Sequence, residues 1–265
     1  TLVSGAVLLG NFYLANRFSR GPSTLAVGPG SMRLLWALTA AGVAIIVISA
    51  APIFGSVAQG RWETFLLFFN KVSFGVTDAE FGQDVSFFVV TLRMLQFIQG
   101  WVMGLLITCV VTSLALYAGT YAVRGLKFAV APRMLKHMGV LGAVLMLSVA
   151  TGHVLDVYEM VLSPGGLVAG ATYTDINARI PVLWLMTGIA TLAGVGLGTS
   201  IYYGGLRLMI GSFSLWVIMV LLANLAFPPL FQRFQVDPNE FSKESPFIHV
   251  TSNKSLPSEI FTWLQ

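Results

Sequence analysis

Five long stretches of this chain contain no Asp, Glu, Lys or Arg: residues 34–60, 94–123, 137–155, 180–206 and 208–232. About 20 consecutive apolar residues are enough for a helix to cross the hydrocarbon core of a bilayer. Charged residues make up only 10% of the 265 residues, against roughly 25% in an ordinary soluble domain, which leaves too few to cover a water-exposed surface. The sequence therefore predicts an all-α fold, a polytopic transmembrane helical bundle.

A sixth apolar stretch, residues 1–16, opens the chain and is short for a span. Because the first residue is Thr1 and not Met, we interpret this stretch as the remainder of a longer helix in a trimmed or partial chain. About six spans result, at roughly 1–16, 33–54, 95–122, 136–158, 180–203 and 208–230. An even number of crossings returns the chain to its starting side, so both termini are expected on the same face of the membrane.

The charges between the predicted spans are divided unequally between the two sides. One side holds eight bases and no acid: Arg17, Arg20, Arg33, Arg124, Lys127, Arg133, Lys136 and Arg207. The other side carries all eleven acids and the remaining seven bases. An excess of Lys and Arg in short loops marks the cytoplasmic side, whereas acids contribute little to orientation. Both termini are therefore predicted to be extracytoplasmic, and His137, at the start of a span, is interpreted as a residue of the cytoplasmic interface.

The outer segments are long enough to form structure of their own. Between Arg61 and Lys71, apolar side chains recur at helical spacing, which is typical of a helix in the headgroup plane; they are Trp62, Phe65, Leu66 and Phe69. The following DVSFFVVTLRML (84–95) is either a similar surface helix or the entry to the third span. We divide the chain into a transmembrane domain over 1–230, with interfacial helices at about 59–92, and a polar part over 231–265. That part is an extracytoplasmic tail or the stub of a larger domain.

Composition and motifs exclude several classes of site. The single cysteine, Cys109, lies in an apolar run, so neither a disulfide framework nor a cysteine-based metal site can form within the chain. The net charge of +4 arises from bases scattered in short loops, which indicates membrane orientation and no nucleic-acid partner. No phosphate-binding loop, zinc-protease or hydrolase motif occurs, so an enzyme is disfavoured and the cofactor is left unknown.

Ionisable groups at mid-membrane depth would be the first functional candidates, but the central turns of spans two, three, five and six hold none. His153, Asp156 and Glu159 share one helical face near the outer end of the fourth span. They are candidates for a metal or proton site, with Asp175 of the next loop as a further ligand. The alternative, which we favour, is no metal site but a polar helix end that pairs with Arg179 or a neighbouring loop.

Four charged residues of the outer loops are predicted to form a structural cap: Asp78, Asp84, Asp175 and Arg179. None of them can face hydrocarbon without a large penalty, so we expect hydrogen bonds and ion pairs that join loop 72–90 to loop 170–181. Asp175 and Arg179 are four residues apart and would pair on a helix that begins in the TDINAR run, with Thr174 or Asp175 as its N-cap.

Glycines at a spacing of four residues predict close helix packing. Gly100 and Gly104 lie in the third span, and Gly194 and Gly198 lie in the fifth. Small residues at this spacing let two helix backbones approach each other within the membrane.

Three outer segments carry distinctive motifs: RWETFLLFFNKVSFGVTDAEFGQDVSFFVV (61–90), GATYTDINARIP (170–181) and RFQVDPNEFSKESPFI (233–248). In this order the chain resembles a family of large uncharacterised bacterial membrane proteins. The resemblance implies about seven N-terminal spans followed by a large extracytoplasmic domain, so the first span and most of the soluble domain are expected to be absent here. It also implies a bacterial inner (cytoplasmic) or other energy-transducing membrane. The sequence departs from the family after Ile248, and no activity or catalytic residue is carried over.

The function that we favour is a non-catalytic membrane scaffold or accessory subunit of a larger membrane assembly. Its partners would be the lipid bilayer and other membrane-protein subunits. A transporter or channel component is the alternative, and an envelope enzyme acting at the outer surface is a third.

Overall fold

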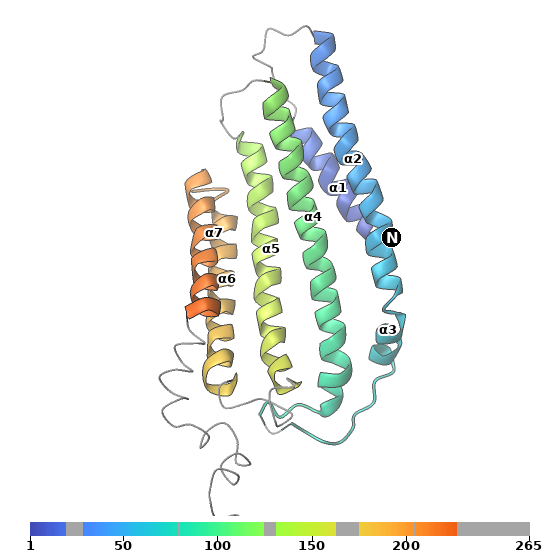
Figure 1. The fold of residues 1–265 in the computed structure, drawn as a ribbon, viewed down its shortest axis with the longest axis vertical. Coiled ribbons are helices and arrows are strands. Elements are labelled where there is room, and N and C mark those ends of the chain that lie inside the picture. The colour runs from blue at the N-terminus through green and yellow to red at the C-terminus, as the bar shows by residue number, and fades with distance from the viewer. Residues whose placement is uncertain (20–28, 79, 125–130, 163–174, 204, 227–265) are drawn as a thin grey trace, which may run out of the picture.

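The computed structural model describes residues 1–19, 29–78, 80–124, 131–162, 175–203 and 205–226, and the secondary structure within these ranges is helical (Figure 1). The long helices are α1 (Leu2–Ser19), α2 (Pro29–Gln59), α4 (Leu92–Arg124), α5 (Pro132–Glu159), α6 (Ile180–Thr199) and α7 (Gly205–Leu221). The short ones are α3 (Trp62–Phe69), the π-helices η1 (Phe87–Thr91), η3 (Asp175–Arg179) and η4 (Leu222–Ala226), and the 3-10 helix η2 (Met160–Leu162). The all-α prediction is confirmed for this part of the chain, and the predicted tail at 231–265 lies outside it.

Four helices of the described residues are long and apolar enough to cross a membrane: Trp36–Gln59, Phe87–Tyr121, Pro132–Leu162 and Asp175–Thr199. Helix α7 is apolar but shorter, at 17 residues. The chain is therefore a membrane protein by the length and composition of its helices, while the count of six crossings and the side of the termini stay predictions.

Successive long helices run in opposite directions (Figure 1). All acids of the described residues consequently lie at one end of the bundle, which we call the carboxylate end; they are Glu63, Asp78, Glu80, Asp84, Asp156, Glu159 and Asp175. The opposite, basic end holds the starts of α2, α5 and α7 and the end of α4. The fold thus separates the two groups of charges as the predicted layout of spans requires.

Residues 84–95 form the entry to a membrane-length helix, one of the two alternatives that the sequence left open. The π-helix η1 runs directly into α4 at Leu92, so there is no separate surface helix after α3. Helix α3 itself extends over Trp62–Phe69, where the apolar spacing predicted it.

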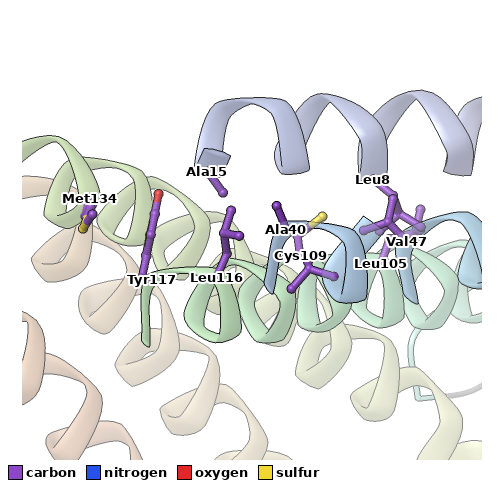
Figure 2. Packing of buried hydrophobic residues seen from close by; sticks show 10 residues of the cluster. Leu8, Ala15, Ala40, Val47, Leu105, Cys109, Leu116, Tyr117 and Met134 are labelled. Carbon is purple, nitrogen blue, oxygen red and sulfur yellow. The ribbon is translucent and has the colours of Figure 1, made fainter. Parts of the chain in front are cut away.

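The main core lies where α1 packs between α2 and α4. Helix α1 buries one residue in each turn along a single stripe: Ser4, Leu8, Asn11, Ala15 and Ser19. Leu8 meets Val47 of α2 and Leu105 of α4 in one apolar cluster (Figure 2). The stripe is narrow and made mostly of small residues. Large apolar side chains of α1 outside the stripe, such as Leu9 and Tyr13, are exposed.

Two polar side chains tie the core helices together within their apolar surroundings. The Asn11 side-chain amide donates to the Cys109 carbonyl and to Ser113 Oγ, both at 3.1 Å. Trp101 Nε1 of α4 donates to the Phe54 carbonyl of α2 at 2.9 Å. Because few competing partners exist in a dry interior, such bonds fix the register of one helix against the next.

Helices α5 and α6 pack more extensively than any other pair of described helices, and glycine lets them approach each other. A Cβ added to Gly194 would lie 3.3 Å from both the Ala143 carbonyl oxygen and Met146 Cβ, and one on Gly198 would lie 3.7 Å from Ala143 Cβ. Of the other pair, Gly104 faces the Phe54 ring, with 3.1 Å between the added Cβ and Cε1. Nothing lies within 4 Å of a Cβ on Gly100.

Candidate functional site at the carboxylate end

The connection from α3 to η1 is organised around one carboxylate. Asp84 accepts hydrogen bonds from the Ser73 hydroxyl and from the backbone N–H groups of Phe74 at 3.1 Å, Gly75 at 3.0 Å and Ser86 at 2.8 Å. An isolated antiparallel bridge joins its backbone to Thr77. Residues 71–86 therefore form a closed loop, which we call the Asp84 loop.

This bonding changes the acidity of the carboxyl. Hydrogen bonds from the Ser73 and Ser86 side chains, and then from the Ser86 and Phe74 amides, hold the pKa of Asp84 well below its usual range. Each donor favours the ionised form, since only a carboxylate accepts all of them. Asp84 is thus an anion that structures the loop at every physiological pH.

Asp78 closes the tip of the same loop. Its Oδ2 accepts from the backbone N–H groups of Glu80 at 3.0 Å and Phe81 at 2.8 Å. Gly82 has φ +63°, in the left-handed region that glycine adopts without strain, and its N–H donates to the Asp78 carbonyl at 3.0 Å. An Asp side chain that accepts from backbone amides two and three residues later, and a Gly with positive φ, are both typical of turns.

Aromatic rings hold the Asp84 loop against the bundle. The Tyr158 ring of α5 packs against Phe81 of the loop, at 5.0 Å between ring centroids, and against Phe87 of η1, at 5.3 Å. Next to them, Gln96 Nε2 of α4 donates to Glu159 Oε2 of α5 at 2.8 Å. Phe81 therefore seats the loop against the end of α5, which the Gln96–Glu159 bond links to α4.

Asp175 and Arg179 pair at the start of α6. Arg179 Nη1 donates to Asp175 Oδ1 at 3.0 Å, with Asp175 buried and Arg179 half exposed. The two residues bracket η3, so the pair spans one π-turn. A bonded cap between this pair and the Asp84 loop stays a prediction, and Thr174, the alternative N-cap, lies outside the described residues.

The structure does not gather the metal-site candidates into a ligand set. His153 Nδ1 lies 3.7 Å from Asp156 Oδ2, too far for a hydrogen bond, and both ring nitrogens of His153 are buried without a hydrogen-bond partner. Glu159 is bonded to Gln96 instead. Throughout the part of the chain that the structure describes, no three His, Cys, Asp or Glu side chains are placed to hold a metal ion.

One polar pair was missed by the sequence analysis. Tyr117 Oη of α4 lies 2.7 Å from His137 Nδ1 of α5, with both side chains buried. The Phe18 ring of α1 packs edge-on against the imidazole at 5.6 Å. His137 is therefore an internal residue and not the interface residue that its place beside Lys136 suggested.

Two apolar grooves flank α7. The first has a volume of about 310 Å³ and is lined by residues of α4, α5, α6 and α7, among them Leu114, Met138, Gly142, Met209 and Phe213. The second, of about 340 Å³, lies between α6 and the end of α7, with Leu185 and Met219 in its walls.

Comparison with known proteins assigns the chain to a family. The sequence model of the uncharacterised protein family UPF0182 matches residues 1–253. A UPF0182 protein of Geobacter sp. (strain M21) is 32% identical over 206 residues, which cover 77% of this chain and 23% of that protein. One from Trichlorobacter lovleyi is 28% identical over 261 residues, or 94% of this chain and 28% of that protein. One from Thermobifida fusca is 32% identical over 207 residues, or 77% of this chain and 20% of that protein.

The chain spans between about a fifth and just over a quarter of the length of these curated relatives. No solved structure matches it. The family match covers the spans together with the outer segments whose motifs first indicated a resemblance. The chain therefore belongs to UPF0182, an uncharacterised protein family.

Proposed function

We propose that this chain is a membrane scaffold, an accessory subunit that holds partner helices within a larger membrane assembly. The observation that carries the proposal is the position of α7. None of its 17 residues is buried, and the helix forms a wall of both apolar grooves. The two grooves lie along different parts of one lightly packed helix, and apolar grooves of this kind are suited to receive transmembrane helices of other subunits.

The frame behind the grooves supports this role. Helices α5 and α6, which both line the first groove, pack closely against each other where Gly194 meets Ala143. The walls of that groove are lined by Met138, Met146 and Met209, and methionine side chains adapt to the shape of an apolar partner. In lipid, helix association depends on such packing, because there is no hydrophobic driving force between helices.

We include in the proposal six crossings of a bacterial inner (cytoplasmic) membrane, or another energy-transducing membrane, with both termini extracytoplasmic. It is supported by the alternation of all six long helices and by the one end whose described residues include bases and no acid.

Site-specific photo-crosslinking in native membranes tests the scaffold. A photoreactive residue at Phe213 or Leu222, in the two grooves, should give discrete protein adducts that also copurify in mild detergent. The control is Ile45, which is exposed on α2 away from both grooves. Adducts with lipid alone at all three positions would refute the proposal.

A transporter or channel component is the second candidate, and the Tyr117–His137 pair favours it. Ionisable side chains buried within membrane-length helices are frequently parts of ion or proton paths. Proton or ion flux in proteoliposomes that is lost in both Tyr117→Phe and His137→Ala would support transport over the scaffold.

A further inference from the structure

Between α2 and the tip of the Asp84 loop, the chain presents a row of apolar side chains that nothing in the described residues covers. Four come from α3 and three from the segment that follows it, and their exposed fractions lie between 53% and 76%: Trp62, Leu66, Leu67, Phe69, Val72, Phe74 and Val76. We call residues 62–76 the interfacial segment. Exposed apolar groups in such number mark a surface that meets something other than water.

The helical part of this segment is fixed in its orientation. Phe65 of α3, at the edge of this apolar surface, packs edge-on against Phe97 of α4 with 5.7 Å between ring centroids. Helix α3 therefore turns its half-buried Phe65 and Phe68 to the bundle and leaves the four exposed apolar side chains on the outside.

The non-helical part is also held in place. Asp84 binds the backbone amides of Phe74 and Gly75, and Gly75 has φ +72°, a conformation that suits glycine. At the start of this non-helical part, Lys71 Nζ donates to Thr91 Oγ1 at 3.0 Å. Val72, Phe74 and Val76 are thus displayed by an ordered loop.

Position and charge identify what the surface meets. The segment begins directly after the membrane-length stretch Trp36–Gln59 and leads back to the next one at Phe87. Helix α2, with 31 residues, is about 46 Å long, whereas a hydrocarbon core is about 30 Å thick, so its end reaches the headgroup layer. Arg61 and Lys71 flank the apolar side chains of α3, Glu63 lies exposed in its first turn, and Asp78 and Glu80 follow in the polar tip of the loop.

We propose that the interfacial segment binds the bilayer itself, with α3 and residues 72–76 inserted together at the boundary between headgroups and acyl chains. Apolar side chains then face acyl chains, the two bases reach lipid phosphates, and the carboxylates of the tip stay in water, as in other interfacial elements. The spacing of Trp62 to Phe69 predicted membrane contact for the helix alone. The inference adds the non-helical residues 72–76, which Asp84 holds in place. It is independent of the scaffold proposal, because it concerns neither groove.

Depth measurements by spin labelling test it on the full chain in nanodiscs of phosphatidylethanolamine and phosphatidylglycerol. A Cys109→Ser background allows single labels through Leu66→Cys, Phe74→Cys and Val76→Cys, with Glu80→Cys at the exposed tip as the matched control. We expect the first three labels to be relaxed strongly by oxygen and weakly by a water-soluble nickel complex, and Glu80→Cys to show the reverse.

Two results would overturn the proposal. Strong relaxation by nickel at positions 74 and 76 would place the segment in water, and protection from both reagents would place it beneath protein. The role of Asp84 has its own readout: Asp84→Ala should raise nickel access at least twofold at position 74 and leave position 66 unchanged. An unchanged position 74 would show that the loop does not depend on Asp84.

Discussion

Tyr117 and His137 are joined across α4 and α5 by a 2.7 Å contact between Oη and Nδ1, deep enough in the bundle that neither side chain is more than 8% exposed. They lie 20 residues apart, on two antiparallel helices. The contact fixes the rotation of both helices at once, because a phenol and an imidazole bond only over a narrow range of directions.

Replacing Tyr117 by Phe should destabilise the protein by about 1–3 kcal/mol, since it leaves a buried imidazole nitrogen without its partner. Thermal unfolding in detergent measures the change. Tyr13→Phe is the matched control, because Tyr13 is exposed on α1, and it should unfold as the unaltered chain does. Equal stability of the two variants would show that the Tyr117 bond contributes nothing.

Replacing Asn11 by Leu should weaken the attachment of α1 to α4. The substitution removes two hydrogen bonds to Cys109 and Ser113, and polar contacts between membrane helices contribute about 0.6–2 kcal/mol. Unfolding by SDS measures this loss. Leu9→Ala, on the exposed side of α1, serves as the control and should leave the midpoint within error.

Gly194→Leu should separate α5 from α6 at a cost of about 1–3 kcal/mol, as overpacking does, because even a Cβ would press on the Ala143 carbonyl and Met146. Gly188→Leu lies on the same helix with nothing within 4 Å of its Cβ and should be tolerated. A lower melting temperature in both variants, or in neither, would contradict the packing.

The Asp84 loop should withstand mild acid. A carboxyl whose folded pKa lies below its unfolded value stabilises the folded form at every pH above the unfolded value, about 3.9 for aspartate. That stabilisation is lost only as the pH falls toward the lower folded pKa. The protection factors of the amides over 71–86, with each exchange rate divided by the intrinsic rate at the same pH, should therefore be equal at pH 7 and pH 5 and should fall below about pH 4.

Two variants separate Asp84 from its neighbours in that measurement. Asp84→Asn should exchange faster already at pH 7 and lose the acid dependence. Glu80→Gln, which alters an exposed carboxyl of the same loop, should behave as the unaltered chain.

The orientation of the bundle is open to a labelling experiment in intact cells. In a Cys109→Ser background, Tyr203→Cys reports on the basic end and Gln83→Cys on the carboxylate end, since both positions are exposed. A membrane-impermeant thiol reagent should label position 83 and spare position 203, because the Lys- and Arg-rich end is expected in the cytoplasm. The reverse pattern would invert the topology.

The sequence was sufficient for features that are local along the chain. The absence of charge over some 20 residues marks a membrane-length helix wherever it occurs, so α2, α4, α5 and α6 were predicted close to their observed ranges. The spacing of Trp62 and Phe69 likewise located α3.

Features that depend on the rotation of one helix against another were not predictable in this way. No spacing rule links Tyr117 to His137, or Asn11 to Ser113, because each pair lies on separate helices whose facing sides are set by the packing of the whole bundle. The four hydrogen bonds to Asp84 were missed for a related reason: most of their donors are backbone amides, which every sequence supplies.

Both connections at the carboxylate end enter their long helices through a π-turn, η1 before α4 and η3 before α6. A π-turn accommodates one residue more than an α-turn, and one residue corresponds to roughly 100° of rotation about the helix axis. Each π-turn therefore sets the rotation of the long helix about its axis relative to the loop that precedes it. Loss of a single residue from a π-turn would restore a regular helix, and the membrane faces of α4 and α6 would keep their neighbours. In η1 the loss would rotate Phe87 about a quarter turn away from Tyr158, and in η3 it would rotate the Asp175–Arg179 pair by the same amount.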